Sequence, residues 1–173
     1  MARLTLSLGS NQQADYHIGQ ALDGLQREFG ELVLSSVFES EAVGFDGGNF
    51  LNMVVAVQTD RDLLDISAAI KAMEVANGRL RNPVKFSSRT LDIDILTYDE
   101  LLGEHHGIKL PRPEITENAF VLWPMSEICG DQTDPHSGRR YRELWQAYDK
   151  TRQQLWPVDF HWQGRRISSA PVS

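Results

Sequence analysis

Apolar and polar residues alternate in some stretches of this chain and recur at helical spacing in others. Leucine alternates with threonine or serine over 4–8, which predicts a first strand. Gly9-Ser10-Asn11 follows, and these residue types suit a turn and a helix N-cap. Apolar residues at helical spacing then predict a helix over 14–29, which Gly30 ends.

The same patterns continue to about residue 98. Further strands are predicted over 32–38, 50–57 and 91–98, with a polar, glycine-containing loop over 39–48 and a helix over 63–77. The resulting order, β-α-β-β-α-β, describes an α+β ferredoxin-like sandwich with its helices on one face of the sheet. Such a fold hosts many functions, so it does not identify one.

The remaining chain gives weaker signals. We expect a hairpin or loop over 104–113, a short apolar piece over 119–122, one helical turn over 124–128 and a weakly amphipathic helix over 139–149. The last 17 residues or so contain Phe160 and Trp162, and we expect the Ser/Arg tail that follows them to be frayed. The whole chain, 1–173, is predicted to be a single domain with a C-terminal helix and extension over 131–173.

Composition excludes several classes of protein. The length of 173 residues is close to one typical domain, and the net charge of −7 argues against a general nucleic-acid binder, which needs a basic face. The lone Cys129 excludes an internal disulfide and a multi-cysteine zinc cluster. No apolar run approaches the roughly 20 residues of a membrane helix, and no secretory signal follows Met1, so we expect a cytoplasmic protein without membrane contact.

Two acids on the fourth predicted strand are the first sign of chemistry. Residues two apart in a strand point to the same face, so Asp92 and Asp94 should lie side by side, opposite the apolar residues that alternate with them. Like charges so placed repel, and Mg²⁺ favours one or two carboxylates together with substrate phosphate oxygens. The alternative is a solvated strand face whose carboxylates resist edge pairing.

A basic cluster precedes this strand. Arg79, Arg81, Lys85 and Arg89 lie within eleven residues in an otherwise acidic protein. Guanidinium groups present planar donor forks that suit phosphate oxygens, so the cluster and the acid pair have the components of a polyphosphate–metal site. The alternative is that the arginines only neutralise the two aspartates.

The third predicted strand carries a further candidate. Phe50 and Asn52 share one face, and an Asn amide both donates and accepts, which suits the edge of a flat heterocycle. Phe86 and Phe120 could supply stacking faces, although each aromatic taken singly is more often part of the core. The sequence holds no P-loop, no HExxH and no GxSxG motif.

Several segments together resemble a known family, the 6-hydroxymethyl-7,8-dihydropterin pyrophosphokinases. The matching segments follow one another over roughly 3–130: Leu8-Gly9-Ser10-Asn11, Phe50-Leu51-Asn52, Glu74 with Gly78-Arg79-Leu80-Arg81, Arg89-Thr90-Leu91-Asp92-Ile93-Asp94-Ile95-Leu96, and Phe120-Val121-Leu122-Trp123-Pro124. The run from Arg89 to Leu96 is the most specific of them.

The resemblance implies a reaction and a metal site. The chain would transfer pyrophosphate from ATP to the hydroxymethyl oxygen of the dihydropterin and release AMP. Asp92 and Asp94 would hold two Mg²⁺ ions that bridge the ATP phosphates and the attacking hydroxyl. Arg79 and Arg89 match the catalytic arginines of the family and would stabilise the charge that develops on the transferred group.

The resemblance also implies where the two substrates bind. Asn52 would read the hydrogen-bonding edge of the pterin, with Phe50 and Phe120 around the ring. Glu74 and Arg81 fall at positions near the nucleotide. Both partners are then small molecules, ATP and a dihydropterin, and we expect a monomer.

Three positions depart from the family pattern. Arg112 stands where the family usually has a histidine, Asn118 stands where it has an arginine, and Phe86 stands at a loop aromatic that is often Trp. These changes leave two alternatives open. The chain could be a catalytically weakened pterin- or nucleotide-binding paralogue, or a related pyrophosphokinase with an altered substrate.

Overall fold

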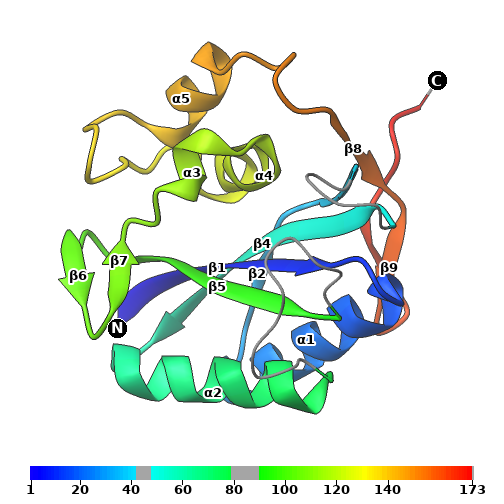
Figure 1. Cartoon of the computed structure of the whole chain (residues 1–173), viewed down its shortest axis with the longest axis horizontal. Helices are drawn as coiled ribbons and strands as arrows, with labels where there is room; N and C mark the ends of the chain where they lie inside the picture. Colours follow the sequence, from blue (N-terminus) through cyan, green and yellow to red (C-terminus); the bar gives the residue numbers. More distant parts are fainter. Residues whose placement is uncertain (42–47, 79–89, 173) are drawn as a thin grey trace.

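An antiparallel sheet lies between two helical layers in the computed structural model, which describes residues 1–41, 48–78 and 90–172 (Figure 1). The main sheet has the order β5-β1-β4-β3-β8, and β2 also pairs with β4. Its strands are β1 (Ala2–Ser10), β2 (Val33–Leu34), β3 (Val37–Ser40), β4 (Phe50–Thr59), β5 (Asp92–Tyr98) and β8 (Leu155–Val158). Two hairpins stand apart from it, β6 (Gly103–His105) with β7 (Ile108–Leu110) and β9 (Phe160–Trp162) with β10 (Arg165–Ser168).

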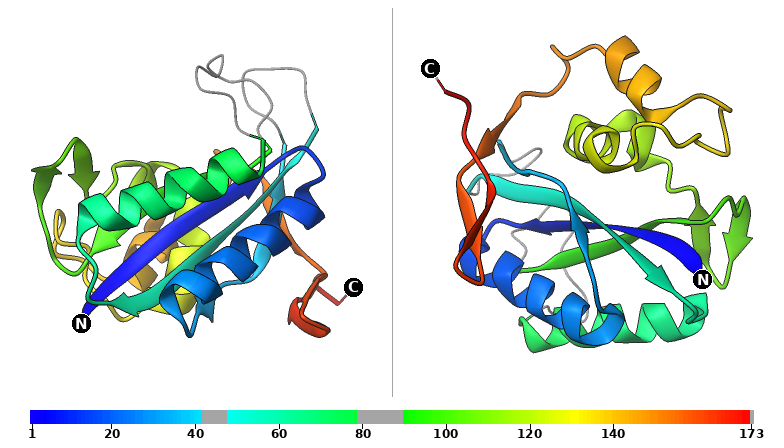
Figure 2. Two further views of the ribbon diagram at one scale, coloured as in Figure 1. Left: turned by 90° about the horizontal axis from the view of Figure 1, so that it is seen from below. Right: turned by 180° about the vertical axis from the view of Figure 1, so that it is seen from behind.

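Two long helices cover one face of the sheet, as predicted. They are α1 (Ala14–Phe29) and α2 (Leu63–Ala76), which lie next to each other below the sheet (Figures 1 and 2). Leu6 of β1 and Val55 of β4 are fully buried between the sheet and these helices, in one apolar core. With this arrangement, the strand order of the first four predicted strands confirms the ferredoxin-like α+β fold.

The predicted cap of α1 is wrong, whereas α2 has a side-chain cap. The strand β1 runs through Ser10, and α1 begins only after Gln13, whose φ of 45° is left-handed and whose side chain makes no capping hydrogen bond. Asp62 caps α2 by accepting a hydrogen bond from the backbone N–H of Asp65 at 2.9 Å.

The second predicted strand, over 32–38, is interrupted and becomes β2 and β3. At the interruption, the Ser35 hydroxyl oxygen accepts a hydrogen bond from the backbone N–H of Val54 at 2.9 Å. Ser36 donates from its backbone N–H and its hydroxyl to the carboxylate of Glu127, at 2.7 and 2.9 Å. Side-chain oxygens therefore supplement the strand ladder at this point, where the Ser35 backbone N–H still donates to the Val54 carbonyl oxygen at 3.0 Å. β3 also extends through Ser40, into the segment expected to be a loop.

Helices also cover the opposite face of the sheet, which corrects the expectation of helices on one face. They are α3 (Glu114–Glu117), α4 (Ala119–Cys129) and α5 (Tyr141–Ala147). Pro124 does not divide α4 into the two pieces that the sequence suggested. Its neighbours Leu122 and Met125 are buried in a second core together with Val54 and Leu96. This packing outweighs the helix hydrogen bond that proline removes.

The C-terminal segment is ordered structure and not the frayed tail that we expected. β8 adds to the sheet edge beside β3, and the β9–β10 hairpin packs near α1 (Figure 2). The Trp162 indole donates to Asp23 at 2.9 Å, and the buried Ser168 hydroxyl accepts from the Val37 backbone N–H at 2.8 Å. In the described part of the chain, no helix is both long and apolar enough to cross a membrane.

Candidate active site

The acid pair lies on the edge strand β5, and the apolar and acidic residues of this strand point to opposite faces, as predicted. Ile93 and Ile95 are buried in the core under the sheet, whereas Asp92 and Asp94 face the α4 side. The alternation is not strict to the end of the strand. Leu96 lies on the same face as Asp94 and joins the core formed with α4. A register shift leaves Leu96 as an extra residue, so that Tyr98 returns to the core formed with α1 and α2.

A row of three residues crosses the sheet at this point. Gly9 of β1 is paired with Asn52 of β4 on one side and with Asp92 of β5 on the other. Paired residues in antiparallel strands point to the same face, so the amide and the carboxylate flank a residue that has no side chain. Because Gly9 has no Cβ, the Asn52 amide oxygen can lie close to it, and no side chain separates a heterocycle-binding candidate from a metal-binding candidate.

A cavity of about 180 Å³ opens over this row. The residues that line it come from β1, β4, β5 and the segment that enters α4. They include the predicted Asn52, Asp92, Asp94 and Phe120, together with Ser7, Leu8, Gly9, Leu96, Arg112, Glu114, Asn118 and Val121. The fold therefore brings the two acids together with Asn52 and Phe120, which are distant from them in the sequence.

The Asn52 side chain is held by Ser40 and lies close to Gly9. Its amide nitrogen donates a hydrogen bond to the Ser40 hydroxyl at 3.1 Å, and the side chain is buried. On the other side, a Cβ atom placed on Gly9 would lie 3.1 Å from the Asn52 amide oxygen. Asn52 thus has one donor already satisfied and an orientation that depends on both neighbours.

A second cavity, of about 310 Å³, lies on the outer side of β5. It shares Asp92, Asp94 and Arg112 with the first and adds Glu74 of α2 among other residues. The buried Glu74 carboxylate accepts a hydrogen bond from the Ile93 backbone N–H at 2.9 Å. The predicted nucleotide residue Glu74 is therefore attached to the backbone between the two aspartates.

Negative charge accumulates around Asp94. Burial and the neighbouring Asp92 carboxylate raise the Asp94 pKa to about 7, against the Arg112 guanidinium, which lowers it. The Arg112 Nη2 atom lies 3.5 Å from Asp94 Oδ1, and its Nε atom lies 3.1 Å from Glu114 Oε2. Glu74 and Glu114 raise the Asp94 pKa further. A site with this balance of charge favours a bound cation.

Sequence and structure comparisons point to one family. A sequence model of the 7,8-dihydro-6-hydroxymethylpterin-pyrophosphokinase (HPPK) family matches residues 5–130. Two similar proteins are each named 2-amino-4-hydroxy-6-hydroxymethyldihydropteridine pyrophosphokinase. The one from Pseudomonas aeruginosa is 34% identical over 82% of this chain and 89% of its own length, and that from Aquifex aeolicus is 36% identical over 74% and 81%. The chain belongs to the HPPK family.

Solved structures show the same fold at low sequence identity. A crystal structure of an HPPK-DHPS in complex with substrates is 12% identical, with a TM-score of 0.72 over 96% of this chain and 48% of that one. The wild-type Plasmodium falciparum HPPK-DHPS with pteroate is also 12% identical, with a TM-score of 0.73 over 96% and 47%. This chain therefore spans about half the length of the solved chains that it matches.

The donor set of this HPPK-family chain fits a hard divalent ion. Within the described residues, no group of three or more His, Cys, Asp and Glu side chains could hold a metal ion alone. Two carboxylates on one face fit an ion such as Mg²⁺, whose other ligands are water and substrate phosphate.

The structure does not place every residue that the sequence predicts for the HPPK site. Phe50 is half-buried at the start of β4 and does not line either cavity. The predictions for Arg79, Arg81, Arg89, Lys85 and Phe86 lie outside the described residues. Sequence reasoning missed Gly9, Ser40 and Glu114 as residues of the site. Gly9 is the one with a signal, because it lies in Leu8-Gly9-Ser10-Asn11, one of the segments that resemble the family.

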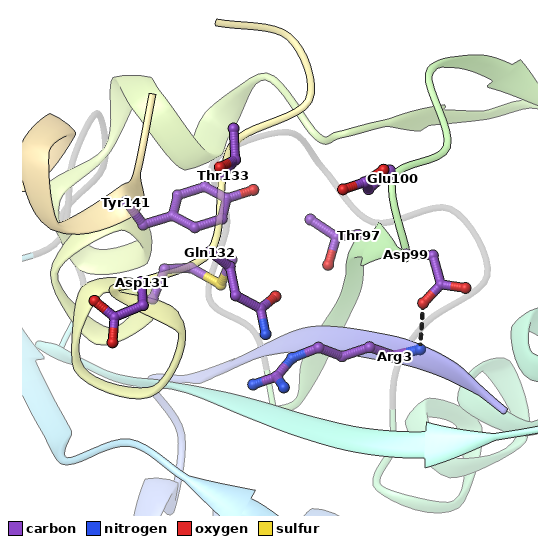
Figure 3. Close-up of a pocket in the computed structure, with 9 residues that line it drawn as sticks. Arg3, Thr97, Asp99, Glu100, Asp131, Gln132, Thr133 and Tyr141 are labelled. Carbon is purple, nitrogen blue, oxygen red and sulfur yellow. Dashed lines mark hydrogen bonds between the residues drawn. The ribbon is translucent and has the colours of Figure 1, made fainter. Parts of the chain in front are cut away.

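The largest cavity that we describe is elsewhere. It measures about 580 Å³ and lies at the other end of β5, where Thr97, Asp99 and Glu100 face Thr133 and Tyr141 across from Arg3 (Figure 3). None of the predicted site residues lines it. We therefore place the candidate active site at the Asn52–Gly9–Asp92 row, because the smaller cavity there is lined by predicted site residues.

Proposed function

We propose that this chain transfers pyrophosphate from ATP to the hydroxymethyl group of 6-hydroxymethyl-7,8-dihydropterin, giving AMP and the pterin diphosphate. The single observation that carries the proposal is the row Asn52–Gly9–Asp92. It sets a group suited to the edge of a heterocycle beside a group suited to a metal–phosphate complex. Membership of the HPPK family and the names of its relatives support the same reaction.

Asp92 and Asp94 would hold two Mg²⁺ ions. When bound, Mg²⁺ neutralises the phosphate oxygens and lowers the barrier to nucleophilic attack on phosphorus. The two aspartates supply oxygen ligands from one rigid strand, and Glu74 fixes the backbone between them. The edge of β5 thus positions both carboxylates before any substrate arrives.

Asn52 and Phe120 would orient the pterin. With one amide N–H held by Ser40, the Asn52 side chain offers its oxygen and its remaining N–H to the ring edge. Phe120 lines the same cavity and supplies an aromatic face, and Phe50 would cover the outer side of the ring. The hydroxymethyl group then lies toward Asp92, because no side chain from Gly9 stands between Asn52 and Asp92.

Residues outside the described part complete the proposal. Arg79 and Arg89 would stabilise charge on the transferred group, and Arg81, with Glu74, would contact the nucleotide. Positioning and electrostatics carry the reaction, and no covalent intermediate is needed. The monomeric state and the cytoplasmic location expected from the sequence stay predictions.

Release of AMP tests the proposal directly. The full chain, Mg²⁺, ATP and 6-hydroxymethyl-7,8-dihydropterin should yield AMP and the pterin diphosphate in equal amounts. Asp92→Asn and Asp94→Asn should each lower kcat at least 100-fold. Asp99→Asn, the same change just beyond β5, should leave kcat unchanged. No AMP above a blank without pterin would contradict the proposal, and pterin binding without turnover would favour the weakened paralogue.

A further inference from the structure

Arg112 is the one residue besides Asp92 and Asp94 that lines both cavities of the candidate site. Its backbone N–H donates to the Leu96 carbonyl oxygen at 2.9 Å, on the outer edge of β5. The backbone is therefore fixed, and the side chain reaches back along the strand to Asp94. The guanidinium lies at the boundary between the cavity with Asn52 and the cavity with Glu74.

The contacts of Arg112 are unequal. Its Nε atom lies 3.1 Å from Glu114 Oε2, whereas its Nη2 atom lies 3.5 Å from Asp94 Oδ1. Both contacts are ion pairs, and the one with Glu114 is the closer, although the buried Glu114 Oε2 atom accepts no hydrogen bond from the described residues. Arg112 can therefore release Asp94 while Glu114 keeps hold of it.

We propose that the Arg112 guanidinium serves as an exchangeable counter-ion, occupying the cation position at Asp94 until a divalent ion displaces it. A cation at a carboxylate and a guanidinium 3.5 Å from the same carboxylate repel each other. The arriving ion therefore has to move Arg112 outward. This inference rests on the proposed function, because it takes Asp94 as a metal ligand.

The Arg112 counter-ion affects both the metal-free protein and the binding of the metal. Without the Arg112 guanidinium, Asp94 would keep the carboxylates of Asp92, Glu74 and Glu114, which raise its pKa, and would lose the cation that lowers it. Arg112 stabilises this arrangement in the empty protein and weakens metal binding by the same interaction. Once displaced, its fork is held by Glu114 at the boundary of the two cavities and can turn to the phosphate that enters with the metal.

Mn²⁺ binding, read by electron paramagnetic resonance at pH 8.5 without nucleotide, tests the competition. Arg112→Gln should bind Mn²⁺ about tenfold more tightly than the unmodified protein, because the repulsion is removed. Arg142→Gln is the control, since Arg142 forms an ion pair with Asp131 away from the site, and the Mn²⁺ affinity of this variant should be unchanged. Adding Asp94→Asn to Arg112→Gln should abolish the gain. Equal or weaker binding by Arg112→Gln would overturn the inference.

Two further measurements distinguish a wrong metal assignment at Asp94 from a wrong inference about Arg112. If Asp94→Asn alone binds Mn²⁺ as well as the unmodified protein, the metal assignment in the proposed function is wrong. If Arg112→Gln does not fold, the side-chain Nε–H signal of Arg112 in ¹⁵N-labelled unmodified protein replaces it. That signal should shift on Mg²⁺ addition while the Arg142 signal stays, and an Arg112 signal that does not move would exclude displacement.

Discussion

The Glu74 carboxylate accepts a hydrogen bond from the Ile93 backbone N–H at 2.9 Å, on the outer edge of β5. An edge strand leaves every second N–H without a strand partner, and here a buried acid from α2 fills that role. The contact lies midway between Asp92 and Asp94. The helix under the sheet therefore holds in place the backbone that presents both acids on the other face.

Replacing Glu74 separates its support of β5 from a contact with nucleotide. Glu74→Ala should lower the free energy of unfolding by about 1–3 kcal/mol, because a buried N–H loses its acceptor. Glu74→Gln keeps an acceptor oxygen and should lose less than half of that. Urea denaturation measures both. If both variants weaken ATP binding equally and neither is destabilised, the carboxylate acts on nucleotide and does not support the strand.

Asp94 should make the metal-free protein less stable as the pH rises. Its pKa is raised to about 7 in the fold, so the folded state binds the proton more tightly than the unfolded chain does. The stabilisation is complete below pH 4 and is lost between about pH 4 and pH 7. In EDTA, Asp94→Asn should therefore unfold at higher temperature than the unmodified protein at pH 8, with the difference shrinking toward pH 4. A difference independent of pH would contradict this.

Gly9→Ala tests whether the row Asn52–Gly9–Asp92 requires a residue without a side chain at its centre. The new Cβ would lie 3.1 Å from the Asn52 amide oxygen and push that side chain out of position. The KM for pterin should rise roughly five- to tenfold, with a smaller change in the KM for ATP. Gly19→Ala in α1 is the control, because a Cβ there meets no atom within 4 Å and should only favour the helix. Equal pterin KM values for both variants would contradict the prediction.

Ser168→Ala tests whether the C-terminal segment stabilises the domain. The buried hydroxyl accepts from the Val37 N–H at 2.8 Å and donates to the Val37 carbonyl oxygen at 3.3 Å. Losing both contacts should cost about 1–3 kcal/mol in the free energy of unfolding. The exposed neighbour Ser169 provides the control, and Ser169→Ala should change stability by less than about 0.5 kcal/mol. If Ser168→Ala leaves the free energy of unfolding unchanged, the β9–β10 hairpin does not stabilise the domain.

Local periodicity predicted the elements whose signals are local. The helix over 14–29 and the acids on one face of β5 depend on spacing along a single segment, and both are confirmed. The single helix α4 was missed, because Pro124 is a local breaker whose effect is outweighed by burial against Val54 and Leu96. The break at Ser35 was also missed, because it depends on a hydrogen bond with Val54, which lies 19 residues away along the chain.

By itself, the sequence determined the residue types and their alternation: two carboxylates on one strand face, an amide on another strand, and the order of motifs that places the chain in its family. Only the tertiary structure decided that Gly9 separates Asn52 from Asp92, that Glu74 supports β5 from below, and that Arg112 reaches Asp94. The physical reason is that strand register and cross-sheet packing depend on partners far apart along the chain, which no local pattern encodes.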